Sequence, residues 1–235
     1  MSYKQFCPIA KAMEVLGEKW TLLIIRELLM NTTRFNEFQK ALSQMSPTLL
    51  TKRLKQLEDN GLLVKKKVPG QKGFEYFPTE ACQELFPVVE QIGIWGMRWL
   101  RHQMTEDDFD LSLLMLYLER SIQTDKLVGR ETVIRFNFID VKDYPNWWIV
   151  ISGNDIDVCT HNPGKEVDVY FTVSVKTMCL LWMGEISYKK AISEGNLVLV
   201  GPRSLTRNVS DWLKPSLFAD IPPAKEILPT SQVET

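Results

Sequence analysis

The sequence has few histidines and cysteines, and the cysteines lie far from one another. His102 and His161 are its histidines, and the four cysteines at positions 7, 82, 159 and 179 share no short spacing. A zinc site or a disulfide framework needs such spacing, so neither is indicated. We expect reduced thiols, no metal and no cofactor.

Long apolar runs and an export signal are also missing. The longest runs, such as residues 20–25, fall far short of the ~20 residues that a membrane span requires. The first ten residues have no basic start, apolar core or small-residue cleavage site. The sequence also lacks a pattern that would support nucleophilic catalysis. Ser174 has no evident base nearby, and His161 lies in a Thr-His-Asn-Pro-Gly turn. These absences favour a cytoplasmic protein that is not an enzyme.

The charges divide the chain into two parts. Residues 1–104 carry 15 Lys and Arg against 10 Asp and Glu, and residues 105–235 carry the remaining 13 basic and 19 acidic residues. The change falls at the polar run 105–110, and 235 residues exceed the usual ~100–150 of one domain. We therefore predict a first domain over residues 1–104, a second over residues 111–217, and an extended tail over residues 218–235.

The first domain begins with three segments of helical spacing. Apolar residues recur from Ile9 to Met30 with an interruption at Gly17, which predicts two helices that meet there. A third helix is expected after Thr33, whose hydroxyl can cap it. That helix would bury Phe35, Phe38 and Leu42.

The fourth segment has a marked start and a marked stop. Ser46-Pro47 supplies a cap and a first-turn proline, and Asn60-Gly61 ends the helix. Leucines 50, 54 and 57 share one side, while Thr48, Thr51, Lys52 and Lys55 share the other. The polar side is either a solvated surface or a face that contacts bases and phosphates.

A basic β-hairpin is expected directly after this helix. Residues 62–68 and 74–77 are strand formers around the turn Pro69-Gly70-Gln71-Lys72-Gly73. A short helix, a recognition-type helix and a basic hairpin make a winged helix-turn-helix, in which the second helix enters the major groove. The DNA-binding candidates from this pattern are Ser46, Thr48, Thr51, Lys52, Lys55, Lys66 and Lys72.

At this point the chain resembles a family. The motifs Cys7-Pro8-Ile9, Gly17-Glu18-Lys19-Trp20-Thr21, Arg34-Phe35-Asn36-Glu37-Phe38, residues 50–57 and Asn60-Gly61-Leu62 are similar, in order and spacing, to the HxlR family of bacterial transcriptional regulators. The resemblance spans residues 6–104. It implies dimeric DNA binding, with Arg34 and the exposed side of the recognition helix near DNA. Pro47 departs from the polar residue that is frequent there, which leaves the target sequence unpredictable.

Residues 84–104 are the candidate dimerisation helix. Leu85, Val88, Ile92, Trp95 and Trp99 repeat at spacings of 3, 4, 3 and 4. The alternative is a helix that packs onto its own domain. A dimer reads half-sites about one helical turn apart, ~34 Å, so we expect an approximately palindromic operator.

Cys7 is a candidate redox residue. It precedes Pro8 at an expected helix start, where the helix dipole favours a thiolate, and some HxlR-type proteins sense oxidants or electrophiles. The alternative is an inert thiol. A sensing role would make operator affinity depend on oxidants and would be lost in Cys7→Ser.

The second domain is predicted to be an α+β sandwich with a mostly antiparallel sheet. A helix at residues 111–122 precedes strands at 132–138, 147–151 and 167–173, helices at 175–183 and 188–193, a strand at 197–201 and a helix near 205–213. Asp168, Thr172, Ser174, Trp182-Met183-Gly184, Ala191, Gly195-Asn196-Leu197 and Gly201 resemble the sterol carrier protein domain. That resemblance implies an apolar ligand cavity, with candidates Trp147, Trp148, Phe171, Leu180, Leu181 and Trp182; the alternative is an ordinary packed core.

The leading interpretation is a homodimeric DNA-binding regulator, expected to act as a repressor, whose second domain binds an apolar small molecule or a protein. A lipid carrier or accessory protein that uses the winged helix for protein contacts is the rival. Binding to DNA distinguishes the two.

Overall fold

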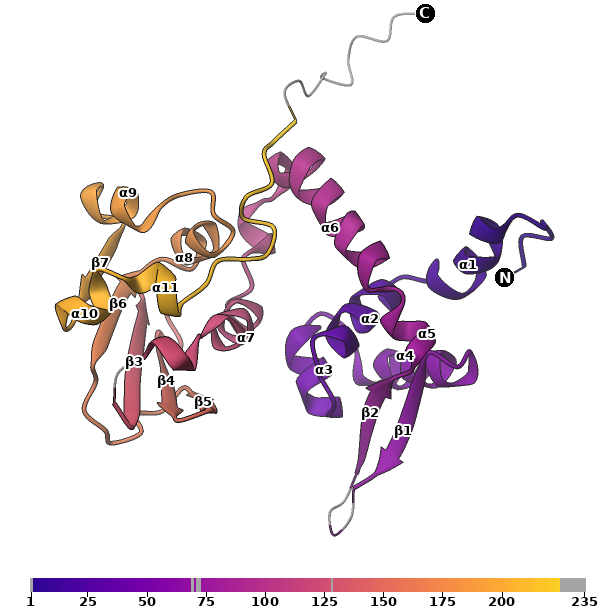
Figure 1. The fold of residues 1–235 in the computed structure, drawn as a ribbon, viewed down its shortest axis with the longest axis horizontal. Coiled ribbons are helices and arrows are strands. Elements are labelled where there is room, and N and C mark those ends of the chain that lie inside the picture. Colours follow the sequence, from indigo (N-terminus) through magenta and orange to yellow (C-terminus); the bar gives the residue numbers. More distant parts are fainter. Residues whose placement is uncertain (1, 69, 71–72, 128, 225–235) are drawn as a thin grey trace, which may run out of the picture. The chain divides into compact units, whose positions relative to one another are not determined.

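The computed structural model describes residues 2–68, 70, 73–127 and 129–224. It divides into two compact units, residues 1–93 and 94–235. Each unit has its own elements, which Figure 1 labels. None of the described helices is long and apolar enough to cross a membrane.

The first unit is a group of helices followed by a two-stranded hairpin. The break expected near Gly17 and the helix expected between Ser46 and Asn60 are both confirmed. The elements are α1 (Pro8–Leu16), α2 (Thr21–Leu29), α3 (Phe35–Ala41), α4 (Pro47–Asp59), β1 (Leu63–Lys67), β2 (Phe74–Pro78), α5 (Glu80–Gln83) and α6 (Phe86–Trp99), which continues into the second unit. This is the winged helix-turn-helix order that the sequence predicts.

The starts of α3 and α4 are fixed in different ways. At α4 the Ser46 hydroxyl accepts a hydrogen bond from the Leu49 N–H at 3.3 Å, so the predicted cap is confirmed. At α3 the expected cap by Thr33 is wrong, because the helix begins after Arg34. The Glu37 carboxylate instead accepts the N–H groups of Thr33 and Arg34, at 3.0 and 2.9 Å. A carboxylate at the third helical position can reach back in this way.

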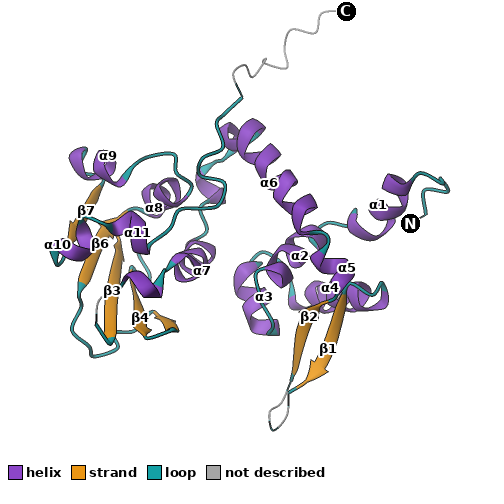
Figure 2. Cartoon of the chain, viewed as in Figure 1, coloured by secondary structure: helices purple, strands orange, loops and turns teal. Residues whose placement is uncertain are grey.

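The second unit contains a five-stranded mixed sheet with helices beside it (Figure 2). Strand order is β5-β4-β3-β6-β7; β3 and β6 are parallel and the other neighbours are antiparallel. The elements are η1 (Arg101–Gln103), η2 (Glu106–Asp108), α7 (Leu111–Ser121), η3 (Thr124–Lys126), β3 (Glu131–Phe138), β4 (Asn146–Ser152), β5 (Asp155–Cys159), β6 (Val169–Val173), α8 (Val175–Trp182), α9 (Tyr188–Ser193), β7 (Leu197–Val200), α10 (Arg203–Thr206) and α11 (Val209–Trp212). The predicted α+β class and the mostly antiparallel sheet are confirmed.

The core of this unit lies between the helices and one face of the sheet. Phe136 and Phe171 stack at 4.6 Å between ring centroids, and Trp212 meets Phe171 edge to face. All three side chains are at most 1% exposed. The opposite face carries a separate small cluster of Val133, Trp148 and Val150. Alternation along β3 and β4 thus sends neighbouring residues to different faces.

Candidate DNA-binding surface

The exposed side of α4 gathers the predicted DNA-contacting residues. Leu50, Leu54 and Leu57 are at most 2% exposed and anchor the helix, whereas Thr48, Thr51, Lys52 and Lys55 are exposed. The Thr51 hydroxyl donates to the Pro47 carbonyl at 2.9 Å. Because its hydrogen is used within the helix, Thr51 presents a methyl group and an acceptor outward. Such a side chain suits a thymine methyl or an exocyclic amino group in a major groove.

The two lysines of this side differ in their surroundings. Lys55 Nζ lies 2.7 Å from Asp59 Oδ1 and 3.8 Å from Glu58 Oε2. The hydrogen bond and charge of Asp59 raise the pKa of Lys55 above its usual value. Exposed pairs of this kind are weak and screened by salt, so a phosphate can replace the carboxylates. The roles of Lys52 and Lys55 at DNA stay predictions.

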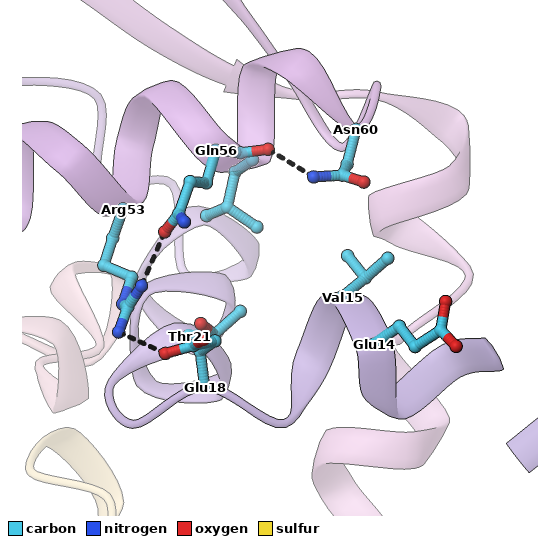
Figure 3. A pocket seen from close by; sticks show the side chains of 8 residues that line it. Glu14, Val15, Glu18, Thr21, Arg53, Gln56 and Asn60 are labelled. Carbon is cyan, nitrogen blue, oxygen red and sulfur yellow. Dashed lines mark hydrogen bonds and ion pairs between the residues drawn. The ribbon is translucent and has the colours of Figure 1, made fainter. Parts of the chain in front are cut away.

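Arg53 points away from this side and connects α4 to the turn between α1 and α2 (Figure 3). Its guanidinium donates to Glu18 Oε2 and Gln56 Oε1, both at 2.6 Å, and to the Lys19 carbonyl at 3.2 Å. The side chain is 9% exposed, and it borders a recess of about 100 Å³, smaller than the ~300 Å³ of ordinary ligand pockets. Arg53 therefore anchors α4 to the turn between α1 and α2.

Replacing Arg53 by methionine is expected to lower the free energy of unfolding by about 2 kcal/mol. Breaking a fully buried pair costs ~3–5 kcal/mol, but Glu18 is 51% exposed and can be hydrated when its partner is lost. Urea denaturation followed by circular dichroism measures the change. Lys55→Met, an exposed lysine of the same helix, is the control and should change stability by less than ~0.5 kcal/mol. Equal stability of the two variants would contradict the anchoring role.

Arg34 joins the start of α3 to the hairpin. Its guanidinium lies 2.9 Å from Glu75 Oε1 in β2, and the Tyr76 N–H donates to the Thr33 carbonyl at 2.9 Å. The side chain is 31% exposed, so it remains accessible, but Glu75 compensates its charge. Sequence reasoning missed Glu75, which has no local signal for this pairing. The role of Arg34 at DNA stays a prediction.

Two lysines of the hairpin lie above aromatic rings. Lys65 Nζ lies 3.9 Å from the centroid of Phe74, and Lys66 Nζ lies 4.9 Å from that of Phe77. Both lysines are exposed, so aromatic contact steadies the side chains while the ammonium groups stay in water. Lys72, the predicted tip residue, lies outside the described residues.

The predicted dimerisation stripe is exposed along α6. Val88, Ile92, Trp95 and Trp99 are 45, 49, 55 and 42% exposed, and Leu85 is half-buried. Monomeric proteins seldom leave large apolar side chains contiguous on one helix side. The exposure disfavours the alternative that this stripe serves the core of its own chain, and dimerisation stays a prediction.

Cys7 occupies the N-cap position of α1 and is half-buried. Its backbone carbonyl accepts the Lys11 N–H at 3.1 Å, and its thiol makes no capping hydrogen bond. Burial raises the pKa of Cys82 to about 11 and, with the charges of Asp110 and Asp140, that of Cys179 to about 12. These two thiols are therefore protonated at neutral pH, and a redox role of Cys7 stays a prediction.

The six ligand candidates lie in three different surroundings. Phe171 and Leu181 are in the packed core, and Trp147 packs partly against it. Trp148 is on the opposite face of the sheet. Leu180 and Trp182 line two neighbouring cavities, and Trp182 also packs partly against the core. The structure therefore does not bring all six to one cavity. Among the described residues, no cluster of three or more metal-ligating side chains occurs.

Both units match known families. Residues 15–104 match the HxlR-like helix-turn-helix family, and residues 116–214 match the SCP-2 sterol transfer family. The HTH-type transcriptional regulator YvaP of Bacillus subtilis is 32% identical over 43% of this chain and 94% of its own length. The regulator sll1512 of Synechocystis is 33% identical over 43% of this chain and 75% of its own length.

A solved structure of quinone-bound YodB from B. subtilis is 30% identical over 39% of this chain and 98% of that chain, with a TM-score of 0.34. The assignment of the family comes from the family match and from YvaP, which this chain covers almost entirely. The chain belongs to the HxlR family of helix-turn-helix transcriptional regulators and carries an SCP-2 sterol transfer domain in its second unit.

Proposed function

We propose that the chain binds an approximately palindromic operator as a homodimer, represses transcription there, and responds to an apolar small molecule in its second unit. The observation that carries the DNA-binding part is the exposed side of α4. It displays two threonines and two lysines on a helix whose other side is anchored by buried leucines. Side chains held on a rigid helix lose little further freedom when they meet bases.

The contacts divide into two kinds. Thr48 and Thr51 would meet base edges in the major groove, and Lys52 and Lys55 would meet guanines or phosphates. The hairpin lysines 65 and 66 would lie along the neighbouring backbone. Two copies joined through the α6 stripe would place two such helices at half-sites ~34 Å apart.

The second unit supplies the regulatory part of the proposal. A ligand changes DNA affinity only if it binds two arrangements of the dimer with different affinity. The excess of acidic residues after position 104 makes this part a poor phosphate binder, which suits a ligand-sensing role. The rival interpretation is a lipid carrier whose winged helix contacts proteins, and a carrier has no need of selectivity for DNA.

Binding of the purified chain to its own upstream DNA and to a scrambled duplex, over a salt series, tests the proposal. We expect a preference of about 10³-fold or more for the upstream DNA, since specific binders reach this ratio. Both affinities should fall with salt as phosphate contacts are screened. Equal weak binding to both, together with no enriched fragment in a genome-wide selection of bound DNA, would overturn the regulator and favour the carrier.

A further inference from the structure

A cavity of about 390 Å³ lies in the second unit, between the segment 100–110 and the helices α7 and α8. This volume falls within the ~300–1,000 Å³ typical of small-molecule sites. The cavity borders the packed core, because its lining residue Leu114 belongs to the core cluster and Trp182 packs against that cluster. The interior of the core is filled by Phe136, Phe171 and Trp212. Its lining residues are Leu100, Gln103, Met104, Asp108, Phe109, Asp110, Leu113, Leu114, Tyr117, Cys179, Trp182 and Met183.

Two stacked aromatic rings line the cavity. Tyr117 of α7 and Trp182 of α8 stack at 4.6 Å between centroids, with 6° between their planes. The Trp182 indole N–H donates to the Ser121 hydroxyl at 2.8 Å, which fixes the ring. A rigid aromatic wall favours a flat partner, and it attracts a cation.

The charged residues that line this cavity are both acidic. The Asp108 carboxylate accepts the Thr105 N–H at 2.7 Å, and the Asp110 carboxylate accepts the Leu113 N–H at 2.8 Å as the cap of α7. Backbone donors thus hold both carboxylates in place. The charge of Asp110 also contributes, after burial, to raising the pKa of Cys179, so its field reaches the cavity wall.

Nearby basic side chains line a neighbouring cavity of about 370 Å³ instead. The two cavities share Met104, Phe109 and Met183 as lining residues. Arg101 Nη1 lies 2.7 Å from Glu185 Oε1, and Lys176 pairs with Glu106. Each of these basic side chains thus has a carboxylate partner within its own cavity lining.

We propose that the cavity between the segment 100–110, α7 and α8 binds a flat, apolar molecule that carries one positive charge. The apolar body would lie against Leu113, Met104 and the Trp182 ring, and the cation would face Asp108 and Asp110. A carboxylate of the same shape would be repelled. Leu100, which directly follows the last residue of α6, is one of the residues that an occupant would contact. This inference deepens the ligand part of the proposed function and rests on it.

Three pyrene probes of one shape test the ligand class: 1-pyrenemethylammonium, 1-pyrenemethanol and 1-pyrenecarboxylate. Each is titrated by calorimetry into the full chain without DNA. We expect the cation to bind at least about tenfold more tightly than the alcohol, and the carboxylate to bind most weakly. The carboxylates of Asp108 and Asp110 attract a positive charge nearby and repel a negative one. The inference would be overturned if the three probes bound with equal affinity, or if the alcohol or the carboxylate bound most tightly. It would also be overturned if no probe bound at about 1 mM, which is near the weak limit of measurable affinity.

Matched substitutions locate the site. Asp110→Asn keeps a good N-cap for α7 but removes the charge, so preference for the cation over the alcohol should fall at least about fivefold while alcohol binding is unchanged. Asp157→Asn, an exposed carboxylate of β5 that does not line the cavity, is the control and should change neither. If a chain with both Asp108→Asn and Asp110→Asn still prefers the cation over the alcohol, the cation binds elsewhere. The operator titration is run on the same preparation: specific DNA binding without probe binding overturns this inference alone.

Discussion

Replacing Thr51 and Lys52 together by alanine is expected to remove selectivity for the operator over random DNA. The wild-type preference of about 10³-fold or more should fall close to one, because each good base contact contributes ~1–3 kcal/mol of discrimination. Both side chains are exposed on α4, and alanine is the best helix former, so the fold should not change. Parallel titrations of operator and scrambled duplex measure the ratio. If Lys52 contacts a phosphate in each half-site, the salt slope of residual binding should also decrease by about two, one for each subunit of the dimer.

A matched double substitution on another helix is the control for this variant. Lys189→Ala with Ser193→Ala removes one lysine and one hydroxyl from α9, which lies in the second unit. The Ser193 hydroxyl donates to the Lys190 carbonyl at 2.9 Å, much as Thr51 donates to Pro47. The control should keep full selectivity. Full selectivity in the α4 variant would refute α4 as the recognition helix.

Local signals explain why α4 and the hairpin could be predicted. Ser46-Pro47 and Asn60-Gly61 mark both ends of α4, and its leucine spacing identifies the buried side. Strand formers on either side of a glycine-containing turn identify β1 and β2. In each case the residues that determine the element are close in the sequence, so tertiary contacts are not needed to find it.

Elements that depend on tertiary packing were predicted less well. The short strand β5 was missed, since its Asp-Ile-Asp-Val-Cys sequence forms a strand by pairing with β4. The helix expected near residues 205–213 is two short helices, α10 and α11, separated at Arg207 and Asn208. The helix expected at 84–104 is shorter, because α5 precedes it and a 3₁₀ turn, η1, follows it. Propensity gives such boundaries poorly, because neighbouring segments decide where hydrogen bonding stops.

The same distinction applies to the candidate site. Exposure of the α4 threonines and lysines follows from helical periodicity, and the Lys55–Asp59 pair could have been found from its spacing of four. The Arg34–Glu75 and Arg53–Glu18 pairs join residues 41 and 35 positions apart and need the folded chain. The cavity in the second unit likewise forms only where the segment 100–110 meets α7 and α8. Its aromatic and acidic residues have no common spacing in the sequence.

Replacing Trp95 and Trp99 by glutamate is expected to convert the dimer to a monomer and to weaken operator binding by about 10²–10⁴-fold. Each tryptophan can bury ~150–250 Å² in an interface, whereas a glutamate placed there would bury an unpaired charge. Without the dimer, the second half-site no longer benefits from a high effective concentration. Sedimentation equilibrium gives the oligomeric state, and titration with an operator carrying one or two half-sites gives the affinities.

Glu90→Lys is the control for this variant, because Glu90 lies on the side of α6 opposite the stripe at 100° per residue. It changes the net charge by two and should leave both the dimer and operator affinity intact. A Trp95→Glu, Trp99→Glu chain that remains dimeric would show that the stripe is not the interface. If the variant is monomeric but binds the two-half-site operator with unchanged affinity, one winged helix suffices for recognition. That result would contradict the palindromic operator, but it would not contradict the role of α4.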